Sequence, residues 1–192
     1  MAGRMQLEPS GEPTLDQAAV IKVFDRCFAE SFMTVLCGGA PEPSYEPANG
    51  CAPARLYCRE DYVASALHEV AHWCLAGHDR RLRLDFGFDY QPPPRTTEQQ
   101  KAFFRAELRA QTLELIFSNV AGVCFHPSVD DLDGLHDHLI RQFERDIVLS
   151  VPFMFRWLEI QQGLRARVFR EALSVAAGQS KSRVCAESMR IG

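Results

Sequence analysis

Residues 61–77 read DYVASALHEVAHWCLAG, and they predict a helix that has Asp61 as its N-cap and ends at Gly77. Residues four apart lie on one face of a helix, so the imidazoles of His68 and His72 can converge on one metal ion. Glu69 lies about 100° further round the helix, where it can reach a metal-bound water rather than the metal. This pattern is the HExxH motif, with Glu69 as the candidate catalytic residue.

The rest of this helix is apolar on several sides, through Tyr62, Ala66, Val70 and Trp73. The two histidines and the glutamate are therefore expected in a largely buried element. A buried carboxylate destabilises the fold unless it is paired or bound to a metal. The alternative is a chance match on an amphipathic helix whose histidines have other partners, because many sequences contain HExxH by chance.

A catalytic metal generally has three protein ligands, so a third residue is needed. A second long helix is expected from about Thr97 to Ser118, opened by Thr97 and Gln100 as a capping box. Glu107 falls on its apolar stripe, which favours it as the third ligand, although a glutamate at the stripe's edge can also reach solvent or an arginine. The full set of candidate carboxylates is Asp85, Asp89, Glu98, Glu107, Glu114, Asp130, Asp131 and Asp133.

The remaining segments predict an α+β fold that is mostly helical, with a small β-sheet. Apolar residues recur at helical spacing from Leu15 to about Ala29, and two or three further helices fill residues 130–177, with interruptions near Pro152 and Gly163. The HExxH helix and the Glu107 helix must pack side by side to share a metal, as in a zincin-like fold. The sheet is expected from residues 32–36, 54–58 and 82–90.

The domain layout follows from the polar and proline-rich segments. Residues 38–53 contain four prolines and three glycines, which predicts a long irregular loop inside the domain. We expect a disordered N-terminal tail at residues 1–13, a single catalytic domain at 14–178 and a loose C-terminal tail at 179–192.

Composition narrows the class of protein. The chain has 192 residues and a formal net charge of −4, which argues against nucleic acid as a partner. The N-terminus has no apolar region typical of a secretory signal, and no run of about 18 apolar residues is long enough to cross a membrane. We therefore expect a soluble, cytoplasmic protein with no membrane partner.

The cysteines and the other histidines give weaker signals. The seven cysteines are odd in number and contain no Cys-x-x-Cys pair, so we expect free thiols rather than disulfides or a zinc ribbon. The histidines outside the motif are expected to be surface or satisfied residues: His78, His126, His136 and His138.

Two histidines and one glutamate are compatible with two kinds of chemistry. In a zinc peptidase, Glu69 acts as the general base on a metal-bound water. In a non-haem iron oxygenase, two histidines and a carboxylate occupy one face of Fe(II) and leave positions for dioxygen and substrate. The ligand types alone do not separate these chemistries, and a structural metal closed by Cys74 or His78 is a third possibility.

The sequence around the motif resembles the bacterial elongation factor P hydroxylases. The resemblance is carried by residues 62–77, by Arg80-Arg81, by Asp85-Phe86-Gly87 with Tyr90, by residues 107–114 with Phe117, and by Ala121-Gly122. It extends more loosely from about Val20 to Phe169. The chain departs from the family pattern at residues 58–61, in the loop 38–53 and in the C-terminal third.

The resemblance implies a dioxygen-dependent protein-lysine hydroxylase of the cytoplasm. Members of the family hydroxylate the β-lysylated lysine of translation elongation factor P, and the family implies Fe(II) as the metal, with zinc as the alternative. Carried over residue by residue, it makes His68, His72 and Glu107 the ligands and leaves Glu69 as a neighbouring residue or proton shuttle. Arg80, Arg81 and Arg83 then form a candidate contact with an acidic protein surface.

Overall fold

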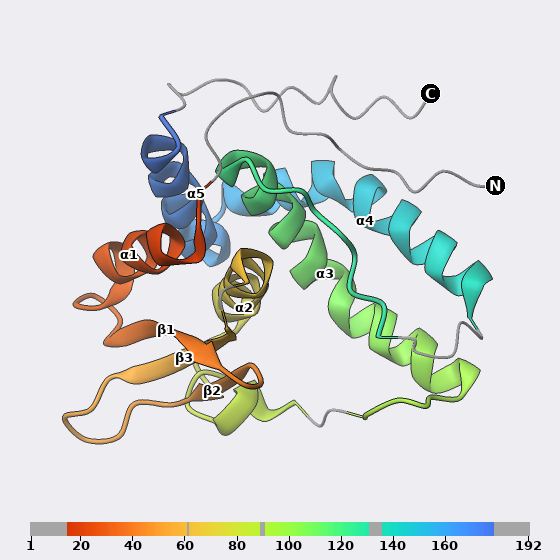
Figure 1. Ribbon diagram of the computed structural model, residues 1–192, viewed down its shortest axis with the longest axis horizontal. Coiled ribbons are helices and arrows are strands. Elements are labelled where there is room, and N and C mark those ends of the chain that lie inside the picture. The colour runs from red at the N-terminus through yellow and green to blue at the C-terminus, as the bar shows by residue number, and fades with distance from the viewer. Residues whose placement is uncertain (1–14, 61, 89–90, 131–135, 179–192) are drawn as a thin grey trace.

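The computed structural model describes residues 15–60, 62–88, 91–130 and 136–178. Within this part of the chain, five α-helices and a three-stranded sheet form the expected α+β fold (Figure 1). The elements are α1 Gln17–Phe28, β1 Thr34–Ala40, β2 Ser44–Glu46, β3 Ala54–Arg59, α2 Val63–Leu75, the short 3-10 helix η1 Leu84–Gly87, α3 Thr97–Ala121, α4 Asp137–Leu158, the 3-10 helix η2 Gln161–Gly163, and α5 Leu164–Ala176. No helix in the described ranges is long and apolar enough to cross a membrane.

The sheet has the strand order β1-β3-β2, in which β1 is parallel and β2 antiparallel to the central β3. Helix α1 packs against β1 and α2 against β3, and Figure 1 shows both helices above the sheet. The strands predicted at residues 32–36 and 54–58 are confirmed, with slightly shifted bounds, as β1 and β3. The third strand is β2, which lies inside the segment 38–53 that the sequence predicted as an irregular loop.

The strand predicted at residues 82–90 is wrong for the described part of that segment. Asp85, Phe86 and Gly87 all have positive φ, which no strand tolerates in succession. Leu82 and Leu84 are 64% and 63% exposed, so the alternation of apolar residues does not mark a half-buried strand. Only Phe86 is buried, and its ring stacks on Tyr45 at 4.2 Å.

Helix boundaries differ from the prediction in ways that have local causes. The capping box of α3 is formed by Thr96 and Gln99, one residue before the expected pair. Helix α4 continues through Pro152, because this residue faces solvent, where water can bond the carbonyl that lacks a helical partner. The N-cap of α2 is Tyr62, without a side-chain bond, and Asp61 lies outside the described residues, as do both predicted tails.

Helix α2 lies at the centre of the molecule, in contact with α1, α3, α5 and β3. Its Trp73 is fully buried, with ring centroids 5.1 Å from Phe24 and 4.7 Å from Phe28. Buried apolar surface of this kind contributes the main stabilisation of the fold. The six cysteines in the described ranges are free, as predicted, and Cys185 lies outside them.

Candidate metal centre

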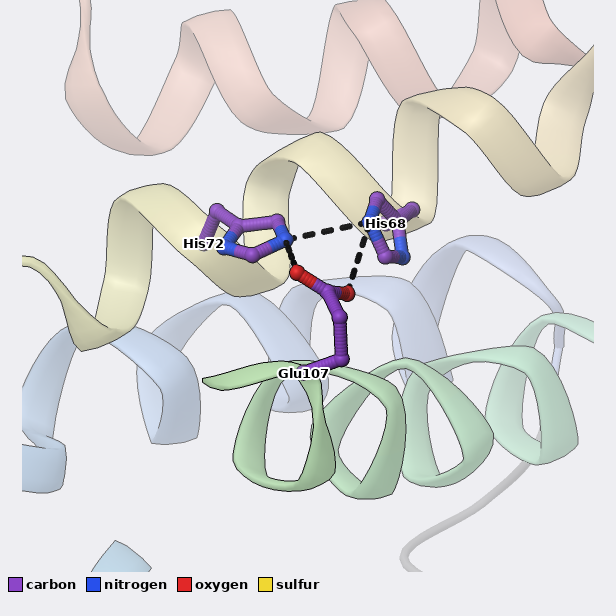
Figure 2. A group of neighbouring side chains, drawn as sticks. All are labelled: His68, His72 and Glu107. Atoms are coloured by element: carbon purple, nitrogen blue, oxygen red, sulfur yellow. Dashed lines mark hydrogen bonds and ion pairs between the residues drawn. The ribbon is translucent and has the colours of Figure 1, made fainter. Parts of the chain in front are cut away.

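The two HExxH histidines and Glu107 meet where α2 packs on α3 (Figure 2). The Nε2 atoms of His68 and His72 lie 3.0 Å apart. The Glu107 carboxylate faces both rings, with Oε1 3.4 Å from His72 Nε2 and Oε2 3.5 Å from His68 Nε2. Their side chains are only 14–20% exposed. One helix therefore supplies two nitrogen donors and the neighbouring helix supplies the oxygen donors.

This arrangement fits a transition metal ion. An ion about 2.0–2.2 Å from each donor separates neighbouring donors by about 3.0–3.5 Å, which is the spacing between these side chains. Among the described residues, His68, His72 and Glu107 form the one group of three or more His, Cys, Asp or Glu side chains placed to hold an ion. Imidazole nitrogen and carboxylate oxygen are the donors found in iron and zinc enzymes.

The other candidate carboxylates have different partners. Asp85 accepts from the backbone N–H of Tyr45 at 2.8 Å, Glu98 pairs with Lys101, and Asp130 pairs with Arg95. Glu114 bonds a histidine of the centre, as described below. The remaining candidates, Asp89, Asp131 and Asp133, lie outside the described residues.

Glu114 holds His68 from the side opposite to Glu107. The Nδ1–H of His68 donates to Glu114 Oε2 at 2.7 Å, and Glu114 is only 4% exposed. A bond at Nδ1 fixes the ring orientation and leaves Nε2 directed at Glu107 and His72. The sequence named Glu114 only as a possible third ligand, because its contact with Nδ1 depends on how the two helices pack.

The electrostatics of the centre are strongly coupled. Burial alone lowers the pKa of His68, but the charge of Glu114 and its hydrogen bond outweigh burial and raise this pKa to about 10. Burial raises the pKa of Glu107, but the hydrogen bond and charge of His72, together with His68, outweigh burial and lower this pKa to about 2. The carboxylates around His68 therefore favour positive charge at this position, which is also what a bound divalent cation supplies.

Glu69 lies one residue after His68 and interacts electrostatically with both histidines and with Glu107. Its pKa is raised above the ordinary value, mainly because burial penalises the charged form. A carboxyl group with a raised pKa close to two imidazoles is suited to accept and return a proton.

Gln111 is the residue that the sequence analysis missed as part of the centre. It is fully buried one turn after Glu107, and its Nε2 lies 3.4 Å from Glu107 Oε2. Gln111 follows Glu107 by four residues and so lies on the same face of this helix. A buried amide at that position was the available signal, because buried polar groups require partners.

The weaker candidates lie elsewhere. Cys74 and His78 do not belong to the ligand group, so the described residues do not support the structural metal closed by either side chain. His126, His136 and His138 also stay outside the group, as expected.

The segment 80–88, which contains the three arginines of the predicted contact surface, borders the centre through Phe88. The ring centroid of Phe88 is 6.1 Å from that of His72. Arg80 stacks over Phe88 at 4.4 Å, whereas Arg81 is half-buried and donates to the backbone oxygen of Ala76. Part of the Arg81 guanidinium is therefore engaged within the fold. Contact with an acidic protein surface stays a prediction for Arg80, Arg81 and Arg83.

Comparison with known proteins shows to which family the chain is similar. A family model described as elongation factor P hydroxylase matches residues 23–186, a range that includes the three candidate ligands and most of the C-terminal third. The chain is also similar to the elongation factor P lysine hydroxylase of Haemophilus influenzae, with 41% identity over 116 residues. That alignment covers 60% of this chain and 65% of the relative, slightly less than two thirds of its length.

Proposed function

The chain belongs to the elongation factor P hydroxylase family, and from this premise we propose that it hydroxylates the β-lysylated lysine side chain of elongation factor P. The observation that carries the proposal is the meeting of His68, His72 and Glu107 at one point of the α2–α3 contact. Residues 14–178 then act as a single catalytic domain, in the cytoplasm, where translation factors work.

The proposed cofactor is non-haem Fe(II), bound by His68, His72 and Glu107. Two histidines and one carboxylate are the typical protein ligands of non-haem iron oxygenases. When bound, the iron supplies the activation of dioxygen that insertion of an oxygen atom into a C–H bond requires. Zinc is the alternative metal, because the same three side chains also bind it well.

The chain's own residues prepare the centre for this chemistry. Glu114 accepts the Nδ1 proton of His68 and so keeps Nε2 directed at the centre. The apolar packing of α2 around Trp73 keeps the histidine backbone in place. Glu69, with its raised pKa, is proposed to hold or move a proton beside the two imidazoles.

The experiment is the intact mass of β-lysylated elongation factor P after aerobic incubation with the protein, Fe(II) and an added reductant such as ascorbate. The reductant is needed because one atom of dioxygen enters the C–H bond and the other must be reduced to water by two electrons. We expect a gain of one oxygen atom, and no gain when dioxygen is excluded. Glu107→Gln removes the carboxylate charge with little change in shape and is expected to abolish the gain. Glu98→Gln is the matched control, because Glu98 lies on the exposed first turn of the same helix and pairs with Lys101, away from the centre.

A result without any mass gain on properly modified substrate contradicts the proposal. Peptide cleavage that needs zinc and Glu69, but no dioxygen, establishes instead the zinc metallopeptidase of the HExxH type, with Glu69 as general base. The two outcomes are separated by the same mass spectra, since hydrolysis shortens the substrate and hydroxylation does not.

A further inference from the structure

Gln111 joins the candidate ligand Glu107 to the backbone of the segment that follows α3. Its Nε2 donates to the carbonyl oxygen of Ser128 at 2.8 Å, and its Oε1 accepts from the N–H of Ser128 at 3.0 Å. These two bonds fix which end of the amide is the nitrogen. In the flipped amide, Oε1 would face the carbonyl oxygen of Ser128 and Nε2 would face its N–H, so neither bond could form. The second hydrogen of Nε2 is then left for Glu107 Oε2, at 3.4 Å.

We propose that Gln111 is a positioning residue that sets the orientation of the Glu107 carboxylate toward the two histidines. The inference rests on the proposed metal centre and extends it to a residue outside the ligand group. Glu107 has three rotatable side-chain bonds, and a ligand must be held in one orientation to bind with full affinity. Gln111 holds Oε2 on the side of His68, while Oε1 faces His72.

The amide of Gln111 is itself held by the segment 123–130. The chain reverses at Gly122, which ends α3 with φ of 69°, and Figure 1 shows the following segment running back along α3. Ser128 supplies both of its backbone groups to Gln111. Since Gln111 is fully buried, loss of its amide leaves these backbone groups and Glu107 without those bonds.

Gln100 provides a matched control on the same helix. It is also buried, at 1% exposure, and its Nε2 donates to the carbonyl oxygen of Val129 at 2.8 Å. It therefore ties α3 to the same segment, but its side chain makes no bond to Glu107. A change at Gln100 removes a contact between α3 and this segment. A change at Gln111 removes both a contact with the segment and the bond to the Glu107 carboxylate.

The experiment compares Gln111→Met and Gln100→Met in the full chain with Co(II) as the probe. Methionine keeps the side-chain length and removes the amide. Both variants are expected to melt at a lower temperature than the parent protein. For Gln111→Met we expect Co(II) binding weakened roughly 10- to 100-fold and a changed visible absorption spectrum of bound Co(II). For Gln100→Met we expect unchanged affinity and spectrum.

Two results overturn the inference while leaving the metal centre intact. One is a Gln111→Met spectrum and affinity equal to those of the parent; the other is an equal loss in both variants, which assigns the effect to the segment alone. Failure of the parent protein to bind Co(II), or binding that survives His72→Ala, overturns the metal centre itself. If Gln111→Met does not fold, Gln111→Glu replaces it, because it keeps the acceptor for Ser128 N–H and is expected to change the spectrum as well.

Discussion

Replacing Glu114 by glutamine is expected to destabilise the metal-free protein in a pH-dependent way. The substitution keeps the shape and a hydrogen-bond acceptor but removes the charge that lies 2.7 Å from His68 Nδ1. Because Glu114 is 4% exposed, water screens this interaction only weakly. The change therefore isolates the charge–charge part of a buried contact.

The magnitude follows from the pKa of His68, which is raised from 6.5 to about 10. At about 1.4 kcal/mol per pKa unit, that rise corresponds to at most about 5 kcal/mol of stabilisation. We expect about 3 kcal/mol, because the glutamine oxygen still accepts the hydrogen bond and removal of one member of a buried pair costs about 3–5 kcal/mol. A raised histidine pKa stabilises the fold fully below the unfolded pKa of 6.5, and this contribution disappears as the pH rises through about 10.

The assay is urea unfolding of chelator-treated parent and variant at several pH values from 6 to 10. The difference in the free energy of unfolding is expected to be largest near pH 6 and to shrink steadily towards pH 10. Glu98→Gln, on the exposed first turn of α3, is the control and is expected to show no such trend. A Glu114→Gln difference that stays constant from pH 6 to pH 10 refutes the reasoning, because it shows that the pair does not exchange a proton in this range.

Three further predictions test other parts of the molecule. His72→Ala is expected to abolish both metal binding, measured by chelator competition, and hydroxylation; activity retained in this variant rejects the site. Arg83→Glu is expected to raise KM for the protein substrate with little change in kcat, and an unchanged KM removes this residue from the docking surface. Arg165→Met removes donors to the backbone oxygens of Cys74 and Ala76 at the end of α2. It is expected to lower the free energy of unfolding by about 1–3 kcal/mol. If metal affinity falls as well, the contact of Arg165 with the end of α2 also supports the metal centre.

The sequence predicted the helices well because their signals are local. The apolar period of α1 and α3 and the i, i+4 spacing of the histidines depend only on neighbouring residues, and the structure contains all three helices. Strand β2 was predicted as loop because prolines flank it at positions 43 and 47 and because its three residues are too few for a periodic pattern. Its formation depends on pairing with β3, a contact that no local pattern contains.

The failed strand prediction at residues 82–90 has a related cause. Alternation of apolar residues indicates a strand only when one face is buried, and here Leu82 and Leu84 remain exposed. The segment is held instead by Tyr45, which stacks on Phe86 and donates its hydroxyl to the backbone oxygen of Arg81. These are tertiary contacts between positions about 40 residues apart, and the alternation of apolar residues carries no information about them.

The candidate site divides in the same way between local and tertiary information. Glu107, Gln111 and Glu114 recur at i, i+4 and i+7, so they lie on one face of α3, the face that packs against α2 and the segment 123–130. Each is a polar side chain in an apolar environment, and each has its partner in or beside the centre: Glu107 the two imidazoles, Gln111 the carboxylate of Glu107, and Glu114 the second nitrogen of His68. Burial of three polar groups on one helix face destabilises the fold unless each has a hydrogen-bond or ionic partner. The spacing thus marks the helix face of the centre, but only the packing of α2 on α3 separates the candidate ligand from the two residues that hold the ligands in place.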